Sequence, residues 1–124
     1  MKRNNKGFTL AELLIVVAII AVLVAISIPI FTTQLEKARE ATDAANIRAA
    51  YAEVMTEALT NADNAASKEV ALKQTQAGWQ DTSITDIGGI DVTSLGVKKD
   101  AIVVVSYDPT KTTAAEQVTI SIKS

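Results

Sequence analysis

An uncharged apolar run constrains this chain more than any other feature. No residue from Leu13 to Leu35 carries a formal charge. Roughly 20 such residues cross the hydrocarbon core of a bilayer as a helix. Lys2, Arg3 and Lys6 precede the run, and no basic cluster follows it. The positive-inside rule therefore predicts a single-pass membrane protein whose N-terminal residues lie in the cytoplasm and whose C-terminal body lies outside.

A cleaved secretory signal peptide is the first alternative reading of this run. Such a peptide needs only about 7 to 15 apolar residues, followed by a small-x-small cleavage site. The run here is longer, and it continues directly into the helix-forming residues 32–60. The sequence therefore favours a retained helix over a removed signal peptide.

Glu12 places a carboxylate just inside the apolar region. A carboxylate at the centre of a bilayer costs on the order of 2.5 to 3.5 kcal/mol, and less near the end of a span. Polar groups within spans are commonly functional and have a nameable partner. The obvious partner for Glu12 is a free amine at the same depth. Cleavage after Gly7 would create one on Phe8.

The segment "KGFTLAELLIVVAIIAVLVAISIPIF" resembles the class III leader and N-terminal segment of type IV pilins and the related pseudopilins. The resemblance covers about the first third of the chain. The matching features are the short basic leader and the residues Gly7, Phe8, Thr9, Leu10, Glu12 and Pro29. The resemblance implies cleavage between Gly7 and Phe8 by a prepilin peptidase and N-methylation of Phe8. It also implies extraction of the mature subunit from the membrane into a helical filament.

The resemblance gives Glu12 and Pro29 expected roles in assembly. In this family the glutamate is thought to neutralise the Phe8 amine of a neighbouring subunit, since an unpaired charge in an apolar filament core is strongly unfavourable. Pro29 lacks the N–H that would bond the Ala25 carbonyl, so a kink or weak point is expected there. Assembled pili of the family can lose helical structure ahead of the equivalent proline.

The helix is expected to continue beyond Thr33 as an amphipathic segment and to end near Leu59. Its apolar residues between Ile47 and Leu59 are the expected seat of the C-terminal body. Charged residues, including Glu36, Glu40 and Asp43, interrupt the apolar ones.

The remaining residues predict a small antiparallel sheet. Residues 101–107 and 117–123 are rich in β-branched side chains and form a predicted hairpin across a loop that contains Pro109. Residues 69–76 are a possible third strand. Residues 77–100 are expected to form an ordered loop, pinned by Trp79, Ile84, Ile87, Ile90 and Leu95.

The predicted fold class is therefore α+β, a long N-terminal helix packed against a C-terminal antiparallel sheet. The predicted divisions are a leader peptide (residues 1–7), a hydrophobic transmembrane and filament-core helix (8–33) and a head (34–124). We call residues 8–33 the apolar segment.

Composition argues against catalysis and cofactors. The chain has no Cys and no His, which removes thiolate nucleophiles, Cys/His metal sites and His-based catalytic pairs. Asp81, Asp86 and Asp91 are oxygen ligands of the type that calcium prefers, but their spacing lacks an EF-hand pattern, so solvated loop carboxylates are favoured. No enzyme activity, metal or other cofactor is predicted. Without its leader the chain has 9 basic and 14 acidic side chains, a balance unsuited to nucleic-acid binding.

These features favour a structural subunit of an extracellular type IV pilus filament, made as a membrane-anchored precursor. The expected partners are other copies of the chain, the prepilin peptidase, the inner-membrane pilus assembly machinery and, before assembly, the membrane. Twitching motility and cell adhesion are tasks that the resemblance associates with such filaments.

Two alternatives stay open. A pseudopilin of a type II secretion or competence machine would share the leader and the helix. A signal-anchored extracellular binding module would make Glu12 and the Gly7 to Phe8 junction incidental.

Overall fold

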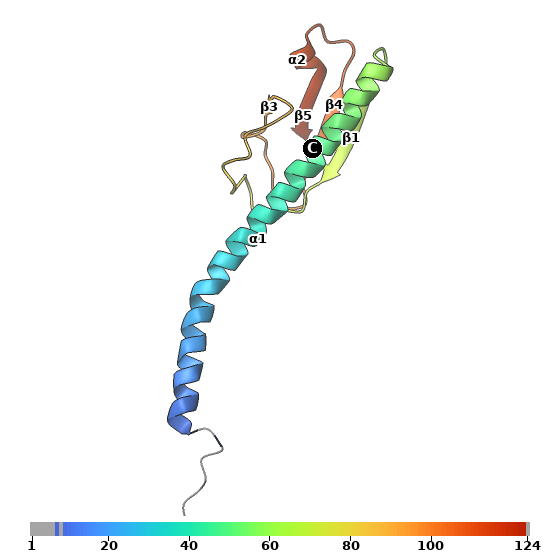
Figure 1. The fold of residues 1–124 in the computed structure, drawn as a ribbon. Coiled ribbons are helices and arrows are strands. Elements are labelled where there is room, and N and C mark those ends of the chain that lie inside the picture. Colours follow the sequence, from blue (N-terminus) through green and yellow to red (C-terminus); the bar gives the residue numbers. More distant parts are fainter. Residues whose placement is uncertain (1–6, 8, 124) are drawn as a thin grey trace, which may run out of the picture. The chain divides into compact units, whose positions relative to one another are not determined.

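The computed structural model describes Gly7 and residues 9–123. These residues divide into two compact units, one ending at Gln34 and the other, the head, beginning at Leu35. The elements in chain order are α1 (Leu10–Thr60), β1 (Ala66–Ala71), β2 (Asp86–Ile87), β3 (Ile90–Asp91), β4 (Ile102–Tyr107), α2 (Ala114–Gln117) and β5 (Val118–Ile122) (Figure 1). The predicted α+β class is confirmed.

Helix α1 is 51 residues long and ends within one residue of the predicted Leu59. Its predicted start, Phe8, lies outside the described residues. Pro29 lies inside α1, and helix is assigned on both sides of it. In this single chain the helix thus continues through Pro29, because a proline removes one backbone donor and leaves the other hydrogen bonds of the helix available. The loss of helical structure ahead of Pro29 was expected for assembled filaments and stays a prediction. The hydroxyl groups of Thr32 and Thr33 donate to the Pro29 carbonyl (2.9 and 3.0 Å).

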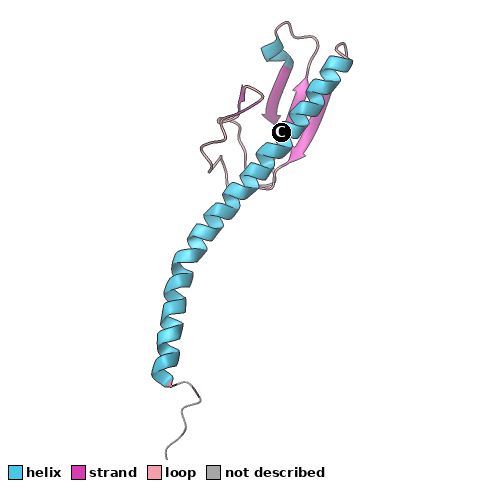
Figure 2. Ribbon diagram, in the orientation of Figure 1, coloured by secondary structure: helices cyan, strands magenta, loops and turns pink. Residues whose placement is uncertain are grey.

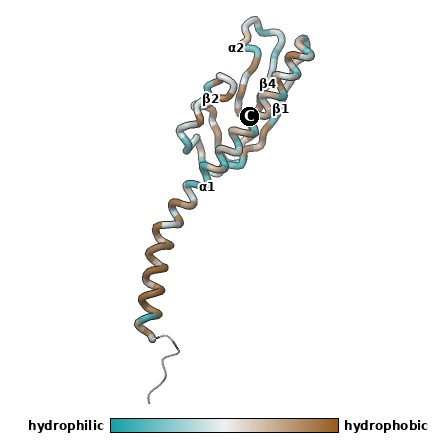
Figure 3. Tube along the Cα trace, in the orientation of Figure 1, coloured by the Kyte–Doolittle hydropathy of each residue, from teal (hydrophilic) through white to brown (hydrophobic). Residues whose placement is uncertain are grey.

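The first half of α1 is apolar on every side. Every large apolar side chain between Leu10 and Phe31 is exposed, with exposed fractions of 45–75%. Figure 3 shows that this part of the helix is mainly hydrophobic. Within the described residues, α1 is long and apolar enough to cross a membrane, as a membrane anchor requires.

The sheet is antiparallel, with the strand order β1-β4-β5. The predicted hairpin is confirmed as β4 and β5, in which Val105 pairs with Ile120. A third strand is present, but its predicted bounds, residues 69–76, were wrong, since β1 covers residues 66–71. The backbone N–H groups of residues 73–76 bind side chains of α1 instead of a neighbouring strand. All described strands belong to the head (Figure 2).

The core of the head lies between α1 and one face of the sheet. The buried apolar residues of α1 recur at helical spacing: Ala44, Ile47, Ala50, Val54 and Ala58. They form one cluster with the inward-facing sheet residues Val70, Val103, Val105, Tyr107 and Val118. The predicted apolar stripe is correct for Ile47, Val54 and Ala58. It is wrong for Leu59, which is 81% exposed because it lies about 100° around the helix from Ala58.

Residues 77–100 form the expected ordered loop, with a small hairpin that the sequence analysis missed. Strands β2 and β3 pair across Gly88 and Gly89, whose φ angles are 60° and 84°. Two consecutive residues with positive φ suit a two-residue type I′ turn. A Cβ at Gly88 would overlap the Tyr51 ring, so glycine is required there for space as well. Trp79 is half-buried against the core, as predicted, and its Nε1 donates to the Val92 carbonyl (2.9 Å).

Three carboxylates of α1 are buried, contrary to the expectation that they interrupt the apolar face. Glu36, Glu40 and Asp43 have exposed fractions of 1%, 0% and 0%. Their spacing of four and three residues places them on one face of the helix. They bind residues 73–81 and directly precede the apolar core, which begins on α1 at Ala44. We call these three side chains the carboxylate clamp.

The carboxylate clamp binds two backbone N–H groups with each side chain. Asp43 accepts from Lys73 and Gln74 (2.7 and 2.9 Å), Glu36 from Thr75 and Gln76 (2.7 and 2.9 Å), and Glu40 from Gln80 and Asp81 (2.9 and 2.8 Å). Glu36 also accepts from the Thr75 hydroxyl (2.7 Å). Hydrogen bonds to an ionised acceptor are stronger than neutral ones, so the clamp fixes residues 73–81 onto the helix.

The electrostatics of Glu36 follow from these bonds. Burial raises the pKa of its carboxyl group, but hydrogen bonds from the Thr75 hydroxyl and from the backbone of Gln76 and Thr75 lower it. The Arg39 guanidinium, 3.4 Å from Glu36 Oε2, acts in the same direction. The net result is a pKa below the ordinary value, so Glu36 is ionised at neutral pH.

Replacing Glu40 with Gln is expected to lower the free energy of unfolding of the head by about 2 kcal/mol. The amide NH₂ would face one of the two backbone N–H donors and leave it without an acceptor. Urea unfolding of the full chain in detergent micelles, followed by the fluorescence of Trp79, measures the loss, because Trp79 is the sole tryptophan. The matched control is Glu53→Gln, which removes an exposed ion pair with Lys68 and should cost less than about 0.5 kcal/mol. Equal losses from the two variants would contradict the clamp.

The head is also expected to lose stability in acid. Because the folded pKa of Glu36 lies below its ordinary value of 4.5, its contribution is complete above that value and is lost as the pH falls through the folded pKa. Glu36→Gln should therefore show a smaller drop in the free energy of unfolding between about pH 6 and about pH 3 than the unmodified chain. The same unfolding assay, repeated over this range, makes the comparison. Identical pH profiles for the two chains would show that ionisation of Glu36 does not stabilise the head.

Candidate processing and assembly site

Gly7 lies in an accessible position before the helix. It is exposed, it is not part of α1, and a Cβ built on it would have no atom within 4 Å. Phe8 lies outside the described residues. The cleavage junction and the N-methylation of Phe8 therefore stay predictions. The structure describes only Gly7 of this junction, as an exposed residue three positions before the start of α1.

Thr9 caps the start of α1, a feature that the sequence analysis missed. Its Oγ1 accepts a hydrogen bond from the backbone N–H of Glu12 (3.1 Å), and its carbonyl accepts from Leu13 N (3.1 Å). A side-chain oxygen that binds the N–H three residues ahead satisfies one of the donors left free at a helix start. The signal was present as Thr9-x-x-Glu12, the spacing of a capping box.

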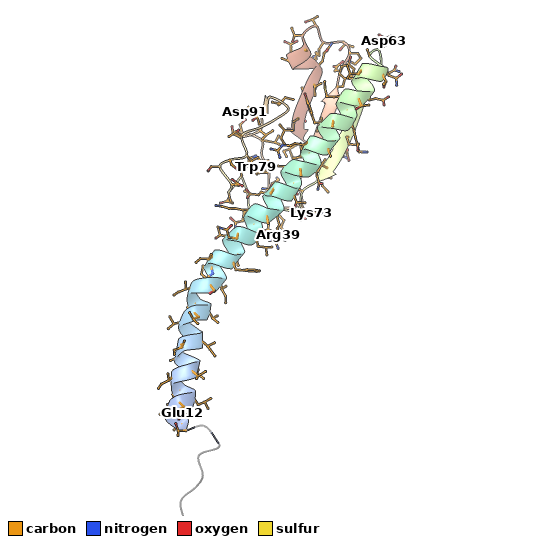
Figure 4. All side chains as sticks on the ribbon, in the orientation of Figure 1. Glu12, Arg39, Asp63, Lys73, Trp79 and Asp91 are labelled. Carbon is orange, nitrogen blue, oxygen red and sulfur yellow. The ribbon has the colours of Figure 1, made fainter. Side chains whose placement is uncertain are left out.

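Glu12 lies in the first turn of α1, with an exposed side chain (Figure 4). Its carboxylate has no hydrogen bond or ion pair with Gly7 or with any of residues 9–123. The first turn is the positive end of the helix dipole, where a negative side chain is favoured. This position suits a carboxylate that helps to balance positive charge near the start of the helix.

Pro29 is separated from this group. It lies 17 residues after Glu12, or about 25 Å along the helix at the standard rise. The structure therefore places Gly7, Thr9 and Glu12 at one end of the apolar segment and Pro29 near the other end. The predicted roles of Glu12 and Pro29 in assembly concern other subunits and stay predictions.

The loop aspartates serve local turns. Asp81 Oδ1 accepts from the backbone N–H and the hydroxyl of Ser83 (2.9 and 2.6 Å), and Asp91 Oδ1 binds Thr93 in the same way (2.8 and 2.6 Å). These hydrogen bonds, the hydroxyl one first, lower the pKa of both carboxyl groups. Asp86 accepts from Gly89 N (3.2 Å) within the β2–β3 hairpin. The part of the chain that the structure describes holds no group of three acidic side chains placed to bind a metal ion.

Comparison with protein families finds one match at the start of the chain. The family described as the prokaryotic N-terminal methylation motif matches residues 2–28. This range contains Gly7, Thr9 and Glu12 and ends one residue before Pro29. No curated protein and no solved structure matches the chain. Together with the long helix and the small antiparallel sheet, this match supports a type IV pilin-like protein with a class III leader.

Proposed function

We propose that this protein is a structural subunit of an extracellular type IV pilus filament. Its precursor is held in the membrane by the apolar segment, cleaved after Gly7 and N-methylated on Phe8. The mature chain then leaves the membrane and polymerises through α1. The observation that carries the proposal is the coincidence of the methylation motif at residues 2–28 with a helix half whose large apolar side chains are all exposed.

The exposed apolar surface of α1 suits both proposed states of the chain, the membrane-anchored precursor and the filament subunit. A helix satisfies its own backbone hydrogen bonds, so it is stable in lipid. Outside the membrane the same surface is unfavourable unless apolar side chains cover it. Other copies of the same helix provide such a cover. The membrane and the filament core are thus two surroundings for one surface.

Glu12 has a physical purpose in this scheme. Cleavage before Phe8 leaves an ammonium group close to the start of α1, where the helix dipole disfavours positive charge. Lipid headgroups and water can solvate both charges while the subunit is in the membrane. A filament core offers neither, so a buried ammonium group there needs a carboxylate partner. We propose that Glu12 pairs with the Phe8 amine of a neighbouring subunit.

The head supports a structural role. It has no cysteine, and its three-stranded sheet, loop and helix are held by one core and the carboxylate clamp. We propose that this head provides contact surface and has no catalytic role. Sheared filaments that contain this chain as the main component would support a pilus subunit, whereas a scarce chain confined to the envelope would favour a pseudopilin.

Replacing Gly7 with a bulky residue is expected to block maturation. A peptidase that cuts after Gly7 must accommodate this residue beside the scissile bond, and glycine presents no side chain. Intact-mass spectrometry of the membrane fraction should find the precursor of Gly7→Leu uncut and the unmodified chain beginning at an N-methylated Phe8. Gly7→Ala is the control, since it adds only a methyl group, and it should be cut at least partly. Mature protein beginning at Phe8 in Gly7→Leu would contradict the peptidase assignment.

Replacing Glu12 with Ala is expected to leave the membrane precursor unharmed and to abolish filaments. Removing a charge from a span lowers its insertion cost, so abundance in the membrane should stay the same or rise. Assembly should fail, because the amine of Phe8 would then lack a partner. Membrane abundance, cleavage state and filament yield are measured on the same cultures.

The control for this experiment is Glu12→Asp, which keeps the charge and shortens its reach. Partial recovery of filaments by Glu12→Asp is expected, since an ion pair weakens as its geometry worsens. A normal filament yield from Glu12→Ala would refute the charge pairing. A chain that is never cut and never forms filaments would instead be a signal-anchored binding module.

A further inference from the structure

The two ends of the head carry unpaired charges of opposite sign. We call the end at which the chain enters, at Leu35, the proximal end, and the end at which α1 stops, at Thr60, the distal end. Figure 4 shows Lys73 near the proximal end and Asp63 at the distal end. The carboxylate clamp ties the residues after β1 to the first turns of the head helix, so the sheet runs between the same two ends.

Three exposed lysines gather at the proximal end: Lys73, Lys98 and Lys99. Leu72 N donates to the Ala101 carbonyl (2.9 Å), and Ala101 N donates to the Lys98 carbonyl (3.2 Å). These bonds place the turn that carries Lys98 and Lys99 beside Lys73. None of the three forms an ion pair with Gly7 or residues 9–123. We call them the proximal lysines.

Three exposed carboxylates gather at the distal end: Glu57, Asp63 and Glu116. Tyr107 Oη, at the end of β4, donates to the Ala62 carbonyl just past α1 (2.8 Å). The first residue of β5 pairs with Tyr107, and α2, which carries Glu116, directly precedes β5. Figure 1 shows α2 and the end of α1 at the same end of the head. None of the three forms an ion pair among the described residues. We call them the distal acids.

Other charges near these ends are opposed locally. Asp100 follows the two lysines of the proximal turn and offsets one of them. At the distal end, Lys111 lies near Asp108, where it adds to the hydrogen bonds from Thr110 that lower the pKa of the Asp108 carboxyl group. Lys123 is paired with Glu69 (2.9 Å) on the outer face of the sheet. The clamp carboxylates are buried against backbone N–H groups, so the exposed charges without an ion-pair partner are mainly lysine amines at the proximal end and carboxylates at the distal end.

Opposite charges at the two ends of one head match a second copy that points in the same direction. A contact between unlike ends is heterologous, so it can repeat from copy to copy, and it builds an open helical filament when the rotation between copies does not close a ring. Charge complementarity of this kind fixes orientation and register more than affinity. We propose that the proximal lysines of one copy lie against the distal acids of another copy in the filament. This inference rests on the proposed function, because it needs a filament in which copies are aligned.

Carbodiimide coupling of unmodified filaments tests the contact directly, because this reagent joins lysine amines to carboxylates only when they nearly touch. Peptide mass spectrometry of sheared filaments should find proximal lysines joined to distal acids. The same joins should be missing from chains dissolved in detergent. The ion pairs Lys68–Glu53 (3.0 Å) and Lys123–Glu69 (2.9 Å) are internal positive controls in both samples.

The outcomes separate the two proposals. Filaments that yield only the internal joins would overturn the contact and leave the filament subunit intact. Failure of the chain to form filaments at all would overturn the proposed function and the contact with it.

Charge reversal supplies an independent readout. Filament yield should fall roughly tenfold for Lys98→Glu with Lys99→Glu, and as much for Glu57→Lys with Asp63→Lys. Trp79 fluorescence confirms that each head is folded. The chain with all four substitutions has complementary ends again and the original net charge, so its yield should return to within about threefold of the unmodified chain. Normal yield from both double variants, or no recovery in the fourfold variant, overturns the contact.

Discussion

Six backbone N–H groups between residues 73 and 81 find their acceptors on three carboxylates of α1, and the arrangement of the head depends on this contact. Buried backbone donors must be satisfied, and a segment that leaves β1 at Ala71 has no strand partner. Carboxylates suit the task because each has two oxygens and a charge that strengthens both bonds. With Glu36, Glu40 and Asp43 on one face, about two turns of helix hold the loop. The chain has no cysteine, so no disulfide can do this.

The character of the α1 sequence changes along the helix, from a part suited to apolar surroundings to a part that packs in the head. Up to Phe31 the apolar side chains point in every direction, which suits lipid or a bundle of like helices. From Glu36 onward one face carries the carboxylate clamp and then the apolar core of the head, while the opposite face stays exposed. Helix α1 thus contains both a segment suited to apolar surroundings and the part that packs in the head. The change falls within a few residues of the boundary between the two compact units.

The parts of the fold that rest on periodicity could be predicted from the sequence. The long helix follows from the uncharged run and the amphipathic pattern, and β4 and β5 follow from their β-branched residues. The carboxylate clamp could not be predicted, because Glu36, Glu40 and Asp43 look like a solvated face until their backbone partners, 30 to 41 residues away, are known. The β2–β3 hairpin is too short for an alternating pattern. Its Gly88-Gly89 pair was a readable signal, as was the Thr9-x-x-Glu12 spacing of the helix cap.

The carboxylate clamp also reduces the number of acidic side chains that are exposed on the head. Counted along the chain without its leader, the body is acidic, with 9 basic and 14 acidic side chains. Three of those acids are buried against backbone N–H groups, and Glu12 belongs to the apolar segment. Without them and without the leader, nine basic side chains face ten acidic ones. In the proposed filament, nearly balanced exposed charges would allow copies to approach closely, and the unpaired charges at the two ends would favour one direction of approach over the reverse. The burial that holds residues 73–81 on α1 thus also leaves the exposed charges of the head nearly balanced.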